Sequence, residues 1–409
     1  MRQHLHDVVV VGGGLVGACL AIALERAGIG VALVDAAPAG ALPEVFDQRN
    51  LSFGEATVHA LDALGVSRHL RTAPAAIRRI HASRHGDFGR VVLDAADHGR
   101  DAFGQVVVAR DFGDALEARL REAPNVVRYR PARFSGTPGC DGSRRRVLVD
   151  GADGPCELAA GLLVGADGTA SGVRDALAIG ADRDEYDQVL VVARVRMSRQ
   201  PDGTAWERFG PDGPTALLPR GDGHHGLVHG VPRGQAAEVA ALDEAAWLER
   251  LQAAMGWRAG RFLHSGPRSA YPMARVVARR TTAPRAVLVG NAAQTLHPIG
   301  AQGFNLGLRD ALALAELLAA ARDADPTQDV GSARLLESWE RRRREDRART
   351  LAFSDGLARL TSNPAPLARP LRSLGLLALA ASATAQGALV GGAMGYRGDT
   401  PRLARGSGA

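Results

Sequence analysis

Residues 7–35 read DVVVVGGGLVGACLAIALERAGIGVALVD and predict a strand, a helix and a second strand in that order. The β-branched run Asp7 to Val11 is typical of a buried parallel strand, and apolar residues recur at helical spacing from Leu15 to Ala27. Glycines end this helix, and Val31 to Val34 predicts the next buried strand. The stretch is therefore a βαβ unit, and we expect the chain to fold around a parallel sheet.

Three glycines with the spacing GxGxxG lie at the turn from the first strand to the helix. Gly12 permits a tight turn, Gly14 removes a side chain where a pyrophosphate approaches the backbone amides, and Gly17 lets the helix pack closely on the strand. Asp35 lies 18 residues beyond Gly17, where an acid binds a ribose hydroxyl. The motif predicts a dinucleotide site made of Gly12, Gly14, Leu15, Val16, Gly17 and Asp35, without separating NAD from FAD.

The composition excludes several classes of protein. At about 150 residues per domain, 409 residues suggest two or three units, or one large α/β domain with an insertion. The sequence contains no lysine, which excludes a Schiff-base enzyme and a P-loop. The net charge of +6 comes from arginines spread along the chain, and the densest run, Arg341 to Arg344, is flanked by acidic residues. We therefore expect a solvated, ion-paired helix there and no nucleic-acid partner.

The three cysteines and one long apolar stretch bear on location. Cys19, Cys140 and Cys156 form no CxxC pair, which favours a reducing compartment and a cytoplasmic protein. Cys19 is expected to be a small buried hydrophobe in the first helix. Leu374 to Gly395 is long enough to span a bilayer but is mostly Ala and Gly with polar residues inside. It favours a soluble or interfacial helix and leaves peripheral contact with the inner membrane open.

Two later segments repeat the strand-then-turn layout, Leu162 to Gly168 and Ala286 to Ala293. The second leads into QTLHPIGAQGFNLGLRD, a glycine-rich loop that is expected to become a helix from about Asn305. Backbone N–H groups at the start of such a helix can bind phosphates or flavin oxygens. Both ends of the chain are therefore expected to build one cofactor site.

The middle of the chain has a different texture, with short extended runs separated by Pro, Gly and Asp turns. This pattern predicts an antiparallel sheet inserted into the α/β domain, and such sheets often form a wall of a substrate cleft. The runs are Val189 to Val195, Trp206 to Phe209, Thr215 to Leu218 and Gly226 to Val228. The tryptophans Trp206, Trp247, Trp257 and Trp339 are expected to be core or interface anchors.

Further motifs extend a family likeness over nearly the whole chain. They are GGGLVG at Gly12 to Gly17, FDQR at Phe46 to Arg49, GQVV at Gly104 to Val107, GADG at Gly165 to Gly168, ERF at Glu207 to Phe209, SAYP at Ser269 to Pro272, and VGNAAQTLHPI with QGFNLGLRD between Val289 and Asp310. On these motifs the chain resembles the single-component FAD-dependent aromatic hydroxylases, the family of para-hydroxybenzoate hydroxylase. Within that family it is most similar to the branch of 2-octaprenyl-6-methoxyphenol hydroxylases of ubiquinone biosynthesis.

The expected fold class is α/β, with a Rossmann-like FAD-binding domain, an inserted antiparallel β-sheet substrate domain and a C-terminal helical segment. We expect residues 1–185 and 275–345 to form the discontinuous FAD-binding domain, which includes part of the sheet insertion near 75–100. Residues 186–274 are expected to form the substrate domain and residues 346–409 the helical segment.

The resemblance also implies which residues contact FAD. Gly12, Gly14 and Gly17 would hold the pyrophosphate, and Asp35 would bind the adenosine ribose. The other implied cofactor residues are Arg49, Gln105, Arg110, Asp167, Gly168, Gly290, Asn291, Gly300, Gly303, Phe304 and Asn305, with Asp167 and Gly168 associated with the nicotinamide nucleotide as well. Asn291 replaces the wider family's aspartate, so it keeps hydrogen-bonding groups but lacks the charge.

The reaction implied by the resemblance uses NADPH or NADH as a transient co-substrate to reduce FAD. O2 would then give a C4a-hydroperoxyflavin that hydroxylates a prenylated phenol, converting a 2-polyprenyl-6-methoxyphenol to the 1,4-benzoquinol. His297, beside the flavin in the family, is a candidate for proton transfer or phenol positioning, and a purely structural role is equally open. Pro298 and Tyr271 are further candidates for the site or its wall. Proteins of a ubiquinone-biosynthesis complex are implied partners.

Other assignments stay open beside this one. The chain could act on another ubiquinone ring position or another aromatic, could be an isoprenoid-lipid flavin reductase, or could be an FAD-stabilised scaffold of a quinone-synthesis complex. The sequence has no redox cysteine pair, and its second GxGxxG match, Gly221 to Gly226, lies between two predicted strands and not before a helix, which argues against disulfide reductases. We expect no metal site, because His225 and His229 lack a carboxylate or thiol to complete a set, and His224 with His225 is expected to be a solvated turn.

Overall fold

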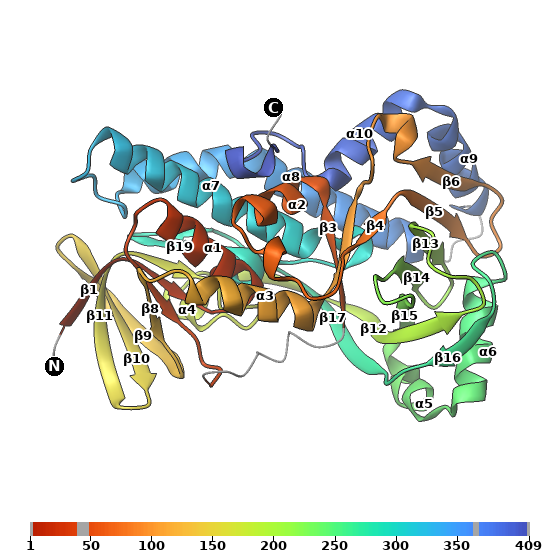
Figure 1. Cartoon of the computed structure of the whole chain (residues 1–409), viewed down its shortest axis with the longest axis horizontal. Coiled ribbons are helices and arrows are strands. Elements are labelled where there is room, and N and C mark those ends of the chain that lie inside the picture. Colours follow the sequence, from red (N-terminus) through yellow and green to blue (C-terminus); the bar gives the residue numbers. More distant parts are fainter. Residues whose placement is uncertain (1–2, 39–48, 363–367, 407–409) are drawn as a thin grey trace.

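The computed structural model describes residues 3–38, 49–362 and 368–406 of the chain (Figure 1). Phe46 to Gln48 of the FDQR motif lie outside these residues. Two sheets lie at opposite ends of the molecule, and the long helices α7 (Gln302–Ala324) and α8 (Ala333–Ser362) run along it on one side. The expected α/β architecture with an inserted sheet and C-terminal helices is confirmed.

The first sheet contains the predicted βαβ unit. In spatial order its strands are β18 (Thr282–Ala283), β19 (Ala286–Leu288), β11 (Gly154–Gly165), β1 (Gln3–Val11), β2 (Val31–Val34) and β8 (Val126–Tyr129), and the antiparallel strands β10 (Arg144–Gly151) and β9 (Ala132–Asp141) extend from β11. From β19 to β8 neighbouring strands run parallel. The strand predicted from Asp7 begins earlier, at Gln3.

Helices cover one face of this sheet and strands β9 and β10 cover the other. Side chains alternate along a strand, so Val8 and Val10 pack on α1 (Leu15–Arg26), α3 (Ala109–Arg121) and α7, while Val9 and Val11 pack toward β9 and β10. Cys19 of α1 is fully buried, as predicted. Two shorter helices are α2 (Glu55–Ala63) and α4 (Gly172–Ala176), and a small third sheet joins β3 (Asn50–Gly54), β7 (Gly104–Val108) and β4 (Ala75–Ile77).

The second sheet contains the predicted central strands. Its spatial order is β20 (Gln294–Thr295), β17 (Ser269–Ala278), β12 (Ala181–Met197), β15 (His225–Pro232), β14 (Pro214–Pro219), β13 (Thr204–Phe209), β5 (Arg79–Arg84) and β6 (Arg90–Asp94), with β16 (Phe262–Ser265) beside β12. Neighbours are antiparallel except β13 and β5, which run parallel. This parallel pair attaches the hairpin β5–β6 from the N-terminal half of the chain.

One face of the second sheet packs on α5 (Ala236–Ala241) and α6 (Glu244–Met255). Val191, Val195 and Leu227 form a core there with the buried Trp247. The other face meets the loop before α7 at one end and α10 (Ala383–Met394) at the other, through Phe209 and Ala205 respectively. The sheet is therefore buried on both faces over much of its area.

The C-terminal apolar stretch is a bent helix pair and not the one helix predicted from residue 374 to 395. Helices α9 (Ala368–Ala381) and α10 break at Ser382, and the axes of their described parts differ by 95°. Within the described ranges no single helix is long and apolar enough to cross a bilayer, and only this bent pair meets the length and composition requirements. Leu374 and Leu377 of α9 are exposed.

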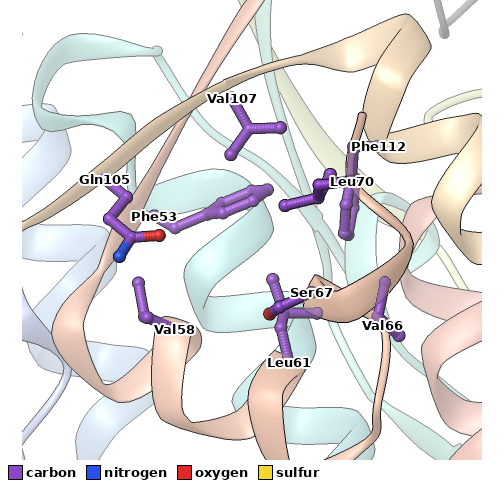
Figure 2. A pocket seen from close by; sticks show the side chains of 9 residues that line it. All are labelled: Phe53, Val58, Leu61, Val66, Ser67, Leu70, Gln105, Val107 and Phe112. Carbon is purple, nitrogen blue, oxygen red and sulfur yellow. The ribbon is translucent and has the colours of Figure 1, made fainter. Parts of the chain in front are cut away.

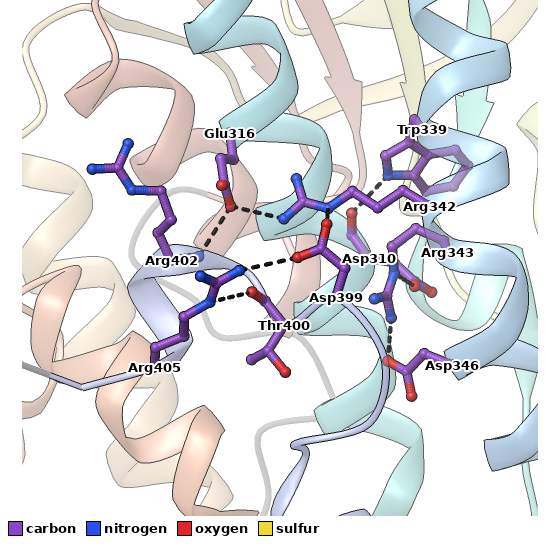
Figure 3. Close-up of polar contacts among 10 residues, drawn as sticks. All are labelled: Asp310, Glu316, Trp339, Arg342, Arg343, Asp346, Asp399, Thr400, Arg402 and Arg405. Carbon is purple, nitrogen blue, oxygen red and sulfur yellow. Dashed lines mark hydrogen bonds and ion pairs between the residues drawn. The ribbon is translucent and has the colours of Figure 1, made fainter. Parts of the chain in front are cut away.

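The arginine run at 341–344 is only partly solvated, contrary to the prediction. Arg343 is 2% exposed and its Nε donates to Asp310 Oδ1 at 2.7 Å (Figure 3). It also pairs with Asp346, whose Oδ2 accepts a hydrogen bond from Arg309 Nε at 2.8 Å. Arg341 does remain on the exposed surface. Arg343 lies on the face of α8 that meets Asp310 of α7. It therefore belongs to a buried ion network between the two helices.

One other prediction for a single side chain is wrong. His225 does not lie in a solvated turn: it begins β15 and is 4% exposed, because the strand starts one residue before the apolar run. Trp257 is 69% exposed, so it is not a core anchor and its role as an interface anchor stays a prediction, whereas Trp247 and Trp339 are buried as predicted. His229 Nδ1 shares a hydrogen bond with Thr215 Oγ1 at 2.9 Å, so His229 has a structural partner.

Candidate active site

The glycine turn at the end of β1 has the geometry that its sequence predicts. Gly12 has a φ of +107°, and a Cβ there would lie 2.4 Å from the carbonyl oxygen of Ala166. A Cβ on Gly17 would lie 1.9 Å from the Gly12 oxygen, so only glycine permits this approach of helix to strand. A Cβ on Gly14 would meet nothing within 4 Å. The space beside Gly14 is therefore open, as a bound pyrophosphate requires.

Asp35 lies at the end of β2, directly over this turn. Gly13 has room for no side chain, because a Cβ there would lie 2.5 Å from Asp35 Oδ2. The backbone N–H of Ala37 donates to Asp35 Oδ1 at 3.0 Å, and Arg130 Nε lies 3.7 Å from Oδ2. The carboxylate is thus fixed next to the glycine turn, where a ribose of a nucleotide on that turn would lie.

The glycine-rich loop of the C-terminal half reaches the same place. Gly290, with a φ of +60°, lies against Val16 and against Gly307 of α7, and a Cβ on it would meet Val16 at 3.1 Å. Asn291, next in the chain, is exposed. The structure therefore brings the first and last predicted cofactor segments together at the start of α1 and α7.

The turn into α7 combines left-handed backbone with open space. Gly300 and Ala301 have φ values of +72° and +51°, and α7 then begins at Gln302, three residues before the predicted start. A Cβ on Gly303 would meet nothing within 4 Å. Asn305 fixes the loop, because its Nδ2 donates to Ala301 O at 2.6 Å and its Oδ1 accepts from Gly54 N at 3.0 Å. The side chain of Asn305 is thus structural, which leaves the backbone of the loop to meet a ligand.

Phe304 and Gln105 face the interior beside the small third sheet. The ring of Phe304 packs against Phe53 and Phe112 at centroid distances of 5.3 and 5.6 Å. Gln105 lies opposite Phe53 in the pairing of β3 with β7 and borders an apolar cavity of about 10 Å³ (Figure 2). Such a cavity holds no more than a water molecule. A role for Gln105 at a ribityl chain stays a prediction.

Asp167 caps the start of α4. Its Oδ2 accepts the backbone N–H of Val173 at 3.0 Å and its Oδ1 accepts the hydroxyl of Ser171 at 2.5 Å, which holds the start of α4. Gly168 follows with a φ of +85°. Arg110 lies exposed in the first turn of α3. The cofactor roles of these three residues stay predictions.

Arg49 and Tyr271 lie together although 222 positions separate them in the sequence. The guanidinium carbon of Arg49 lies 4.4 Å from the centroid of the Tyr271 ring, a cation–π contact. Tyr271 pairs with Leu190 on β12, so both belong to the same face of the second sheet. The contact joins the segment that precedes β3 to this sheet.

His297 borders a cavity of about 170 Å³ between the second sheet and the loop before α7. The opposite wall contains Phe209 and Pro214 of the sheet, and Ile299 and Tyr186 complete the part nearest the imidazole. The rings of His297 and Tyr186 meet edge to face at 4.8 Å. The volume is close to the roughly 150 Å³ that holds a benzene ring. Pro298 itself is exposed.

The electrostatics of His297 restrict its chemistry. Burial lowers the pKa of its imidazole to about 4, so the ring is neutral near pH 7. The backbone N–H of Ile299 donates to Nδ1 at 3.3 Å, which assigns the hydrogen to Nε2. A neutral imidazole in this tautomer can donate a hydrogen bond from Nε2 and is a weak base.

The sequence reasoning missed the sheet side of this cavity. Phe209 belonged to the recognised ERF motif but was given no role, and Tyr186 and Pro214 carried no signal. Strand pairing between distant segments brings them together, and no local pattern predicts that pairing.

This arrangement defines a class of protein: a dinucleotide-binding α/β fold in which a second sheet closes a ring-sized cavity beside the glycine-rich loop. The family described as FAD binding domain matches residues 6–354, and the chain belongs to this family. It is a flavoprotein monooxygenase of the aromatic hydroxylase type, with FAD as cofactor and NAD(P)H as reductant.

Curated relatives narrow the class. The chain is 34% identical to the ubiquinone hydroxylase UbiL of Rhodospirillum rubrum, over 89% of this chain and 84% of that protein. It is 30% identical to the human ubiquinone biosynthesis monooxygenase COQ6, over 91% and 89%, and 29% identical to 3-demethoxyubiquinol 3-hydroxylase of Escherichia coli, over 92% and 95%. It is thus an FAD-dependent monooxygenase of the ubiquinone-biosynthesis hydroxylase family.

Solved structures share the fold. The p-nitrophenol 4-monooxygenase PnpA of Pseudomonas putida matches with a TM-score of 0.77 at 19% identity, over 97% of this chain and all of that one. Aklavinone-11 hydroxylase in complex with FAD and aklavinone matches with a TM-score of 0.67 at 22% identity, over 87% of this chain and 68% of that one.

Proposed function

We propose that the chain hydroxylates a prenylated phenol in ubiquinone biosynthesis, and that its substrate is a 2-polyprenyl-6-methoxyphenol oxidised to the 1,4-benzoquinol level. The observation that carries the proposal is the ring-sized cavity between His297 and the second sheet, in a chain whose curated relatives carry ubiquinone-hydroxylase names. Family membership supplies the reaction class, and the cavity supplies a place for one aromatic ring.

The residues present fit an FAD. We propose that Gly12, Gly14 and Gly17 hold its pyrophosphate, that Asp35 binds its adenosine ribose, and that the backbone from Gly300 to Gly303 meets its ring. The open space beside Gly14 and Gly303 supports this placement. When bound, the FAD supplies electron transfer from NAD(P)H and the activation of O2.

His297 positions the phenol in this proposal. Its neutral Nε2–H can donate to the phenol oxygen and hold the ring in the cavity, whereas its low pKa makes it a poor proton acceptor near pH 7. Tyr186, Phe209 and Ile299 exclude water around the ring. This favours the positioning role for His297 over the proton-transfer role.

A profile of prenylated phenols and quinones in cells lacking this gene tests the assignment, with and without its restoration. We expect loss of ubiquinone and accumulation of a prenylated phenol that lacks one ring hydroxyl, both reversed by restoration. An unchanged profile in a strain that also lacks any second hydroxylase for the same ring position would exclude the pathway.

A second candidate is hydroxylation at another ring position. The similarity to the E. coli 3-demethoxyubiquinol 3-hydroxylase, over 95% of that protein, supports it. The identity of the accumulated intermediate separates the two, because a demethoxyubiquinol and a prenylated methoxyphenol differ in mass and in ring substitution.

A further inference from the structure

One carboxyl group stands out on the face of the second sheet that borders the cavity. Directly opposed residues across a sheet share a face, so the strand pairings define rows of side chains. The row next to the cavity contains Tyr271, Leu190, Gly230, Phe209 and Arg84, with Pro214 opposite Phe209. Phe209 and Pro214 line the cavity, so this face of the sheet forms its wall.

Glu207 lies on the same face of the sheet, two residues before Phe209 in β13. Residues two apart on a strand point to the same side and are about 7 Å apart. The row of Glu207 contains Ser269, Val192, Val228, Ala216, Ala82 and Val91. Of these described residues Glu207 alone is charged, and its immediate neighbours across the strands are Ala82 and Ala216, whose side chains are short. The lining of the cavity reaches Phe209, in the next row.

Among the residues that the structure describes, no basic side chain pairs with Glu207. Ala205 and Ile80, on the far side of its row, pack with Val390 and Met394 of α10. Arg84, the nearest basic residue in the cavity row, lies 3.9 Å from Asp87. Glu207 makes no hydrogen bond or ion pair to any residue in the described part of the chain. A carboxyl group retained in an apolar setting costs stability, so a ligand group that pairs with it would account for its presence.

We propose that Glu207 is a catalytic residue that accepts the hydrogen bond of the substrate's phenol hydroxyl from the sheet side of the cavity. His297 would donate to the same oxygen from the opposite wall. This inference rests on the proposed function for the substrate, but the phenol contact itself needs only a phenol.

The contact also gives the phenol proton a destination. The phenol O–H bond breaks, a carboxyl O–H bond forms on Glu207, and the electron pair stays on the phenolate, which activates the ring toward the electrophilic oxygen. After hydroxylation the ring loses its sp3 C–H proton to water and regains the Glu207 proton on the phenol oxygen, so the carboxylate is restored. Burial raises the pKa of Glu207 to about 7. A phenol has a pKa of about 10, so the two pKa values differ by only about three.

Binding to the FAD-loaded protein tests the contact without turnover. The probes are 2-methoxyphenol and its methyl ether 1,2-dimethoxybenzene, which lacks the hydroxyl, and the readout is the perturbation of the flavin spectrum. We expect the phenol to bind about tenfold or more tightly than the ether, as for a hydrogen bond to a charged group. Glu207→Gln should reduce this ratio to about threefold or less, and the exposed control Glu185→Gln should leave it unchanged.

An undiminished ratio in Glu207→Gln, or no discrimination by the natural protein, would overturn the inference. Retained FAD and an unchanged or raised Tm would show that the variant folds, because Gln keeps the shape of the side chain. Glu207→Ala is the second variant, with the same expected loss of discrimination.

Turnover then separates this inference from the proposed function. With a short-chain 2-prenyl-6-methoxyphenol, Glu207→Gln should form about tenfold less product per NADPH and correspondingly more H2O2, while Glu207→Asp retains part of the coupling. A natural protein that discriminates the probes but does not hydroxylate this phenol contradicts the proposed function and leaves the role of Glu207 intact. Equal coupling in the natural protein and Glu207→Gln contradicts the role of Glu207 alone.

Discussion

Two acidic side chains in the interior of this fold have opposite surroundings. Asp346, between α7 and α8, is 1% exposed and contacts Arg309, Arg343 and Thr350. Burial opposes its ionisation, but the two guanidinium charges outweigh burial and lower the pKa of the carboxyl. Glu207, on the cavity side of the second sheet, lacks such partners among the described residues, and burial raises its pKa.

Asp346 is a charged group that stabilises the fold, whereas Glu207 is, in our proposal, a group that binds a ligand. The buried ion network of the α7–α8 interface fixes α7, the helix that begins after the glycine-rich loop. The sheet face keeps a carboxyl whose charged form the protein alone does not stabilise. Removal of the Asp346 carboxylate should therefore lower the free energy of unfolding, and removal of the Glu207 carboxylate should raise it.

The largest effect is expected for Asp346→Ala. It leaves Arg309 and Arg343 buried without their shared carboxylate, so the free energy of unfolding should fall by about 3–5 kcal/mol. Urea denaturation of the FAD-loaded protein measures it. The exposed control Glu337→Gln, which breaks a surface pair with Arg341, should change stability by less than about 0.5 kcal/mol. Equal losses in the two variants would mean that the network is not what holds α8.

A smaller effect of opposite sign is expected for Glu207→Gln, and it depends on pH. Glu207 titrates near 4.5 in the unfolded chain and near 7 in the folded one, so the native state binds more protons between these values and loses stability as pH rises. The variant lacks this loss. It should match the natural protein at pH 5 and exceed it by about 1–3 kcal/mol at pH 8, a range discounted for partial solvent contact. A difference that does not vary with pH would contradict the shifted titration.

The smallest effect is expected for Thr350→Val. The Thr350 hydroxyl donates to Asp346 Oδ1 at 3.2 Å, and its loss removes one of several contacts to a carboxylate that stays paired. We expect a loss of about 1 kcal/mol in the free energy of unfolding. If the loss approached that of Asp346→Ala, the hydroxyl and not the arginines would be the main support of this carboxylate.

The contrast also explains what could be read from the sequence. The turn from Gly12 to Gly17 and the position of Asp35 follow from residues that are close in the chain, so spacing alone predicts their geometry. Arg343 was assigned to the surface because its burial depends on Asp310, 33 positions away. Glu207 lies on the cavity face of the second sheet because β13 pairs with β5 and β14 in particular registers. No local sequence pattern specifies these registers.

The family resemblance supplied the cofactor and the reaction class correctly. It supplied less for individual side chains, because Asp167 and Asn305 carry capping and loop-fixing bonds that a motif does not reveal. His297 was singled out in a loop, but its neutral state follows only from the burial of the folded protein.

The most direct measurement uses the purified FAD-loaded protein with NADPH, ¹⁸O2 and a short-chain 2-prenyl-6-methoxyphenol. Mass spectrometry of the products follows the label. We predict a quinol with one ¹⁸O atom on the ring, formed in step with NADPH consumption. Unchanged phenol with all label in hydrogen peroxide, or an unlabelled product with a reduced prenyl chain, would contradict the assignment of this chain as a prenylphenol hydroxylase.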